Sequence, residues 1–175
     1  MPGSKIGSQL VDERKPRKRK LTRKVALILL VVPFLAGCAS VAVRPTIQDT
    51  EIINAPFDTV WKAMVGTLAE QSIPIQSIDK ASGDVTTKFV IFAYGNRTEK
   101  EIDNLAVKPA GWMHDWCAGR HKLDIFVTES GTNETTVKVT THFEAFENNI
   151  ERTWMVCYSN GVIEKQLFVA IKKKT

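Results

Sequence analysis

A basic cluster followed by a short apolar run constrains this chain most, because it separates residues 1–37 from the part that folds. Lysine and arginine gather between Arg14 and Lys24, and the apolar run follows at once from Val25 to Leu35. This order is typical of a secretory signal, and the run is well short of the roughly 20 residues that a membrane-spanning helix needs. We therefore predict an export signal in residues 1–37. Its basic cluster starts late, which a misassigned start codon would explain.

A motif of four residues closes the apolar run. It reads Leu35-Ala36-Gly37-Cys38 and resembles the lipobox of bacterial lipoproteins. The resemblance implies that Cys38 is acylated and becomes the N-terminus of the mature chain, and Ala39 after it implies the outer membrane. We thus expect a lipid-anchored protein that faces the periplasm. The alternative is an ordinary signal peptide that ends near a buried cysteine.

The charge of the mature chain gives no reason to expect nucleic acid as a partner. Of the 24 Lys and Arg and 19 Asp and Glu in the sequence, nine and two lie in residues 1–37, so the mature part is near −2. A nucleic-acid-binding domain carries a basic patch instead. The mature length suits one domain with its own core. We assign residues 38–49 to a lipidated tether and residues 50–175 to a single α+β periplasmic domain.

The periodicity of apolar residues predicts two helices and two hairpins. Apolar side chains recur at helical spacing in residues 56–71 and again in residues 161–174. Alternation and turn residues predict strands at 51–54, 73–78, 85–92, 123–128 and 137–144. This order indicates an α+β fold, in which an antiparallel sheet has a long helix packed on one face and a C-terminal helix.

Part of the domain resembles a known lipoprotein family. The stretch from Ile53 to Trp61, followed by residues 73–79 and a Ser82-Gly83 turn, is similar to the helix-grip domains of envelope lipoproteins of the BamC (NlpB) type. In those domains a strand leads into a helix that begins near a Trp, and a hairpin with a Ser-Gly turn follows. The resemblance implies a helix-grip-like fold. It covers residues 50–90, and residues 94–121 have no counterpart in it.

Two cysteines remain once Cys38 is assigned to lipid. They are Cys117 and Cys157, which flank the second predicted hairpin. In an oxidising periplasm, an even pair of cysteines indicates a disulfide. We therefore predict a Cys117–Cys157 bridge. The alternative is two free thiols that are buried as small hydrophobic groups.

The sequence contains no catalytic or metal-binding constellation. Its three histidines match no metal signature, so we expect no metal site, no cofactor and no enzymatic activity. His114 lies near Asp115 and Cys117 in the sequence, and one interpretation of His114 with Cys117 is a catalytic Cys-His pair. A thiol with a second cysteine available in this compartment is more often bridged than catalytic.

A loop rich in aromatic residues is the candidate contact surface. It contains Trp112, Met113 and Trp116, and the segment around the last cysteine adds Trp154. Aromatic residues and Met are enriched at the centres of protein interfaces. The alternative is that these side chains fill the core of the domain.

These features predict a binding or structural component of a cell-envelope assembly, whose partners are the membrane and other envelope proteins. The alternative is a carrier that holds a small apolar ligand in a groove between helix and sheet. A filled space between helix and sheet would favour protein binding, whereas an empty apolar cavity would favour the carrier.

Overall fold

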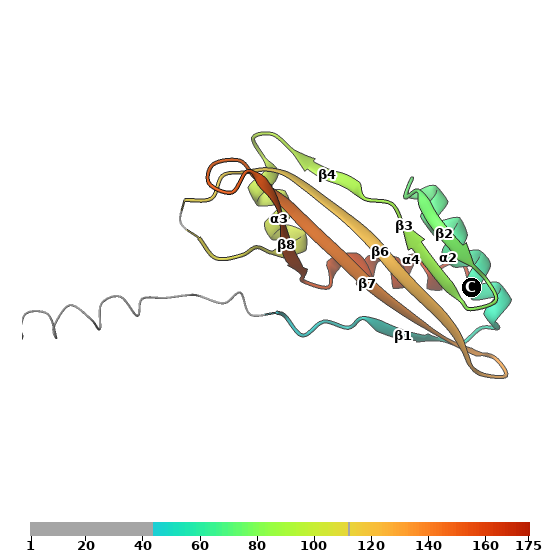
Figure 1. The fold of residues 1–175 in the computed structure, drawn as a ribbon. Helices are drawn as coiled ribbons and strands as arrows, with labels where there is room; N and C mark the ends of the chain where they lie inside the picture. Colours follow the sequence, from blue (N-terminus) through green and yellow to red (C-terminus); the bar gives the residue numbers. More distant parts are fainter. Residues whose placement is uncertain (1–43, 112) are drawn as a thin grey trace, which may run out of the picture. The chain divides into compact units, whose positions relative to one another are not determined.

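A long antiparallel hairpin lies at the centre of the sheet in the computed structural model, which describes residues 44–111 and 113–175 (Figure 1). Its strands are β6 (Trp116–Gly131) and β7 (Glu134–Glu147). Alternate residues of β6, such as Leu123, Ile125 and Val127, are buried. Because successive side chains of a strand point to opposite faces, one face of the hairpin lines a core and the other faces outward.

Shorter strands extend this hairpin on both sides, and every pairing among the described residues is antiparallel. On the β6 side, β3 (Asp84–Thr87) and β4 (Val90–Tyr94) pair with β6, while β2 (Ile75–Asp79) pairs with β3. On the β7 side, β1 (Thr50–Ile53) and β8 (Thr153–Ser159) pair with separate parts of β7. The last strand, β5 (Ala106–Val107), pairs with β8.

Three helices of the described residues lie on the inner face of this sheet, which is the far side in the view of Figure 1. They are α2 (Phe57–Glu70), α3 (Thr98–Leu105) and α4 (Val162–Lys172). The first turn of α2 carries Asp58, a residue that suits the positive end of the helix dipole. Among residues 44–111 and 113–175, no helix lies on the opposite, outer face of the sheet.

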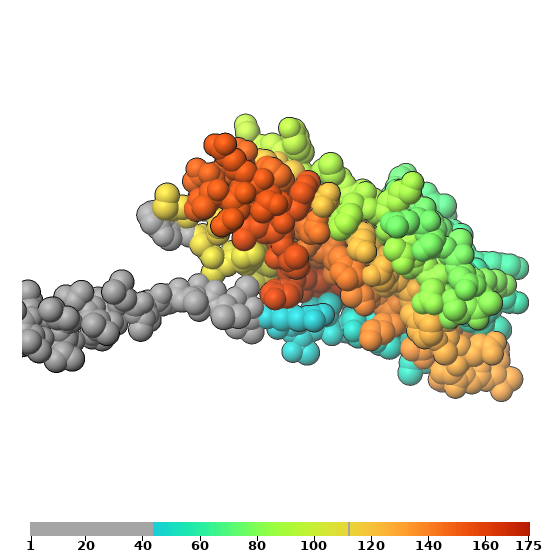
Figure 2. All heavy atoms as spheres, viewed as in Figure 1, coloured from blue at the N-terminus to red at the C-terminus, as the bar shows by residue number. Residues whose placement is uncertain are grey.

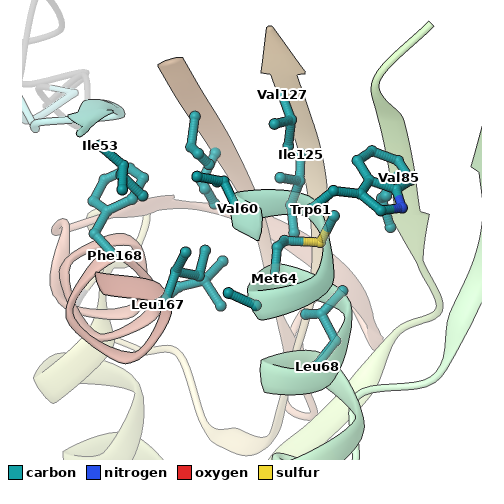
Figure 3. Close-up of a cluster of buried hydrophobic side chains, with 14 of the residues drawn as sticks. Ile53, Val60, Trp61, Met64, Leu68, Val85, Ile125, Val127, Leu167 and Phe168 are labelled. Carbon is teal, nitrogen blue, oxygen red and sulfur yellow. The ribbon is translucent and has the colours of Figure 1, made fainter. Parts of the chain in front are cut away.

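The main core fills the space between α2, α4 and the sheet. Val60, Met64 and Leu68 repeat at intervals of four residues along α2, and all three are fully buried. They meet Leu167 and Phe168 of α4 and the inner residues of β3, β6 and β7 (Figure 3). A second, smaller core lies at the other end of the hairpin, where residues of α3 pack against Trp116 and its neighbours.

The predicted fold class is wrong. We expected a helix-grip-like α+β fold with a long helix on one face of the sheet, but strands occupy 44% of the described residues and helices only 25%. The 14 residues of α2 make a helix about 21 Å long, whereas the 16 residues of β6 span about 53 Å. A helix of that length cannot cover such a strand. The fold is therefore a mostly antiparallel, eight-stranded sheet with three short helices among the described residues.

Most individual elements nevertheless lie near the positions that periodicity predicted. The first strand, α2, the β2–β3 hairpin, the β6–β7 hairpin and α4 are confirmed within a few residues at most ends. The predicted strand at 85–92 is broken at Lys88 and Phe89 into β3 and β4. The sequence analysis missed α3, β5 and β8, and it began the strand of β6 seven residues too late, at Leu123 instead of Trp116.

Candidate functional site

The outer face of the sheet carries two rows of side chains that cross four strands. Strand register aligns Tyr94 of β4, Ala118 of β6, Phe146 of β7 and Trp154 of β8 in one row. The neighbouring row contains Ile91, Arg120, Glu144 and Val156. Phe89, just before β4, joins them. We call the apolar members the aromatic face: Phe89, Ile91, Tyr94, Phe146, Trp154 and Val156.

Much of the aromatic face is open to solvent. Tyr94 is 82% exposed, Val156 66% and Ile91 61%. In the space-filling view, the yellow-green atoms of β4 and the orange-red atoms that lead into β8 gather on the visible face of the molecule (Figure 2). Exposed apolar side chains that cluster in this way mark interaction sites more often than single ones do.

An ion pair lies at the centre of the aromatic face. Arg120 donates from Nε to Glu144 Oε2 at 2.7 Å, and its Nη2 lies 2.5 Å from the same oxygen. The guanidinium carbon lies 4.3 Å from the ring centroid of Phe89 and 4.0 Å from that of Trp154. Trp154 also meets Phe146 edge to face at 5.5 Å. Cation–π and charge-assisted contacts of this kind hold the Arg120 side chain and both rings in fixed positions.

The rest of the outer face has a different chemistry. Towards the turn of the hairpin, β6 and β7 present Lys122, Asp124, Lys138 and His142. His142 Nε2 lies 2.7 Å from Asp124 Oδ2. Phe126 also lies at this end and is 44% exposed. The other side chains there are polar, and the aromatic face lies at the end where β4 and β8 flank the hairpin.

The predicted contact residues do not form one site. Trp116 belongs to β6 and is only 7% exposed, packed into the smaller core, so the core alternative holds for this residue. Met113 is 47% exposed, and its carbonyl oxygen accepts a hydrogen bond from Asn149 Nδ2 at 2.9 Å. Trp154 is the predicted contact that lies on the aromatic face. Trp112, like the predicted lipidation site Cys38, lies outside the described residues.

The predicted Cys117–Cys157 bridge does not fit this sheet. Both thiols are free, and register pairs Cys157 of β8 with Phe143 of β7, which pairs in turn with His121 of β6. Cys157 is therefore two strand spacings, about 9–10 Å, from β6, and Cys117 lies about 13 Å further along that strand. A disulfide needs Cα atoms within about 7 Å. Burial is the main cause that raises the pKa of Cys157 to about 11, so this thiol stays protonated at neutral pH.

A buried carboxylate organises the loop next to the aromatic face. Glu147 at the end of β7 has no exposed surface, and its oxygens accept backbone N–H groups from Asp115, Asn149, Ile150 and Glu151 at 2.5–3.2 Å. Burial by itself raises the pKa of Glu147, but these hydrogen bonds outweigh it and lower the pKa to about 2. Sequence reasoning missed this role, because nothing in the local pattern marks a single Glu as the acceptor for a whole loop.

A second buried carboxylate was also missed. Glu164 in the first turn of α4 has no exposed surface, and its Oε2 accepts a hydrogen bond from Ser159 Oγ at 2.8 Å. The only sequence signal was a Glu at a helix start, which usually faces solvent.

No model of a protein family matches the chain, and no curated protein sequence matches it.

Proposed function

We propose that this chain is a lipoprotein of the bacterial envelope, anchored through Cys38 and facing the periplasm, that binds another envelope protein through its aromatic face. The anchor rests on the sequence, in which a basic cluster and a short apolar run precede the Leu35-Ala36-Gly37-Cys38 motif. Ala39 after the motif supports the outer membrane as the destination.

In residues 44–111 and 113–175, the structure has no helix that is long and apolar enough to cross a membrane.

The observation that carries the binding proposal is the aromatic face itself. It combines exposed apolar and aromatic side chains with an arginine that is held between two rings, and Trp, Tyr and Arg are the residues most enriched at the centres of protein interfaces. The face extends across four strands of a sheet, which suits a protein surface better than a small molecule.

A protein is also a better occupant than a bilayer. Arg120 and Glu144 lie in the middle of the face, and insertion into lipid would bury both charges in hydrocarbon, where no polar group could replace water. A protein partner can offer hydrogen-bonding groups of its own to the ion pair. We therefore expect a partner surface with an apolar rim and a polar centre.

The alternative role as a carrier is less favoured. A small apolar ligand would need an empty groove between helix and sheet, but Met64, Leu68 and Ile125 and their neighbours fill that space (Figure 3). The filled core is the outcome that we associated with protein binding.

The proposal can be tested with a matched pair of exposed valines. Val156 on the aromatic face is 66% exposed, and Val169 on the outer surface of α4 is 60% exposed. A photoreactive phenylalanine analogue placed at either position in the full chain reports what touches that face in living cells. We expect a discrete protein adduct, identified by mass spectrometry, from position 156 and none from position 169.

Substitution then separates a functional contact from chance proximity. Val156→Glu should abolish recovery of the same partner from solubilised envelopes, and Val169→Glu should leave it unchanged. Adducts only with phospholipid, equal adducts from both positions, or no adduct at all would refute the proposal. An adduct of twice the chain's own mass would make the partner a second copy of this protein and refute a separate partner.

A further inference from the structure

A gap in strand pairing opens a cleft beside β7. On one side of β7, pairing with β1 ends at Lys138 and pairing with β8 begins at Phe143 (Figure 1). Among the described residues, no strand pairs with residues 139–142 on this side. The preceding segment, residues 44–49, runs alongside, and Asp49 O accepts the N–H of Val139 at 2.8 Å. The cleft between this segment, β7 and β8 has a volume of about 290 Å³.

The inner wall of the cleft carries acceptors that have no donor. Glu164 is fully buried, and although its Oε2 is bonded to Ser159, its Oε1 has no hydrogen-bond partner among the described residues. Thr141 Oγ1 is also buried without a partner in that part of the chain. Both residues line the cleft. Buried polar atoms in native proteins almost always have a hydrogen-bond partner, so the lack of one at each of these two atoms requires an explanation.

In the described part of the chain, the neighbours of Glu164 leave its Oε1 without a hydrogen bond, and Arg44, which lines the same cleft, forms no ion pair with it. Ser159 Oγ accepts the N–H of Gly161 at 3.0 Å and gives its single proton to Oε2, so it has none for Oε1. Burial is the main cause that lowers the pKa of nearby His121, an effect that Glu164 only partly offsets, so the imidazole is uncharged at neutral pH. Within the described residues, Glu164 forms no ion pair with Lys or Arg. A cation or a hydrogen-bond donor from outside would complete the site.

The chemistry of the wall selects the kind of ligand. Asp49 and Glu144 also line the cleft, but within the described residues no group of three or more His, Cys, Asp or Glu side chains could hold a metal ion. An ammonium group instead has three N–H donors to place. Ile47 and Val156 supply apolar wall with exposed surface in the same cleft, which suits a short carbon chain. A volume of about 290 Å³ admits a small molecule at the lower end of ligand pockets.

We propose that this cleft is a binding site for a small primary alkylamine, whose ammonium group donates to Glu164 Oε1 and Thr141 Oγ1. This proposal does not rest on the proposed protein-binding function, although Val156 of the aromatic face and Glu144 also line the cleft. The ligand's carbon chain lies against Ile47 and Val156.

The test uses the full chain purified from the envelope in detergent, with propylammonium chloride as the probe. The melting temperature is followed by tryptophan fluorescence at pH 7.4 and constant ionic strength, against equal concentrations of tetramethylammonium chloride and propan-1-ol. A ligand that binds only the folded state raises the melting temperature as its concentration rises. We expect a saturable rise with propylammonium that clearly exceeds the rise with either control compound.

Two variants tie the response to the cleft. Glu164→Gln keeps an oxygen for Ser159 and the shape of the side chain, so it should fold, and we expect the dissociation constant to rise roughly tenfold or more. Thr141→Val should weaken binding by a smaller factor and serves as the second variant if Glu164→Gln does not fold. The control is Glu129→Gln, which removes an exposed carboxylate and should leave binding unchanged.

Three results would overturn the proposal. The first is no saturable rise with propylammonium, which would mean that ordered water satisfies Glu164 and Thr141. The second is an equal rise with tetramethylammonium, which has no N–H to donate. The third is an unchanged dissociation constant in both Glu164→Gln and Thr141→Val.

Discussion

The ion pair at the centre of the aromatic face makes a specific prediction about stability. Arg120→Leu removes the hydrogen bond and the ion pair with Glu144 and the contacts with the rings of Phe89 and Trp154. It also leaves Glu144 without its partner at a position where that side chain is only 23% exposed. A carboxylate that loses its partner in a half-buried position costs more than the loss of the contact itself.

The expected size follows from these contacts. A hydrogen bond to a charged group contributes about 1.5–3 kcal/mol, and a cation–π contact at a partly exposed site contributes about 0.5–1 kcal/mol. The contributions overlap, because one guanidinium makes all of them. We therefore expect Arg120→Leu to lower the free energy of unfolding by about 2–3 kcal/mol. The double variant Arg120→Leu/Glu144→Leu removes the unpaired charge and should recover at least about 1 kcal/mol of that loss.

The assay is urea unfolding of residues 44–175, followed by circular dichroism. We expect this fragment to fold alone as a monomer with a cooperative transition, because both cores consist of its residues. Lys80 and Asp58 provide the control pair, since their side chains lie 2.7 Å apart but are 51% and 71% exposed. Their double-mutant cycle should give a smaller coupling energy than the cycle of Arg120 and Glu144, because solvent screens an exposed pair.

Two results would refute this reasoning. If Arg120→Leu and Glu144→Leu were additive in the double variant, the two residues would not be coupled. If the exposed control pair showed the larger coupling energy, burial would not be what makes the central pair matter.

Three further predictions concern other parts of the fold. Gly83→Ala should lower the free energy of unfolding by about 3 kcal/mol in urea titrations, because Gly83 has a φ of +80° and an added Cβ would lie 2.0 Å from Val127 O; an unchanged value would contradict the turn geometry. The lowered pKa of Glu147 means that its stabilising effect is complete above its ordinary value of 4.5 and is lost as the pH falls towards 2. Thermal melts of Glu147→Gln should therefore show a lower melting temperature at pH 7 and a weaker pH dependence between 4.5 and 2, and parallel curves for both proteins would argue against this role. In the folded protein, iodoacetamide should modify Cys117 well before Cys157, because Cys157 is buried with a raised pKa; equal rates, or a recovered disulfide-linked peptide pair, would contradict the register that separates them.

Periodicity in the sequence was enough to find the elements with strong amphipathic patterns. Val60, Met64 and Leu68 mark α2, and Leu123, Ile125 and Val127 mark the middle of β6, because in each case the buried side chains are large and aliphatic. Burial of such side chains drives packing, so their spacing reports the structure directly.

The rest of the sheet was hidden by its composition. The first part of β6 buries Ala118, Gly119 and His121, residue types that carry little strand or core signal. In α3, apolar burial depends mainly on Ile102 within an otherwise polar sequence. The proportions of the fold were therefore predicted incorrectly, although most of its strong elements were correct.

The candidate sites depend on register, which the sequence pattern did not supply. The aromatic face forms because β4 and β8, far apart in the chain, both flank one end of the same hairpin. Ile91 and Val156 lie in one row because strand register places Arg120 and Glu144 between them, on the two central strands. The single predicted contact on this face, Trp154, was found from residue type alone.

The lipid anchor is the central claim of this account, and mass spectrometry of the mature N-terminus tests it most directly. The protein is isolated from the envelope in detergent, and its N-terminal peptide is sequenced with its modifications intact. We predict that the mature chain begins at Cys38 and carries acyl chains on that residue, and that Cys38→Ser is not acylated and is released from the membrane fraction. An N-terminus at another residue, an unmodified Cys38, or a Cys38→Ser variant that remains acylated and membrane-bound would contradict the claim.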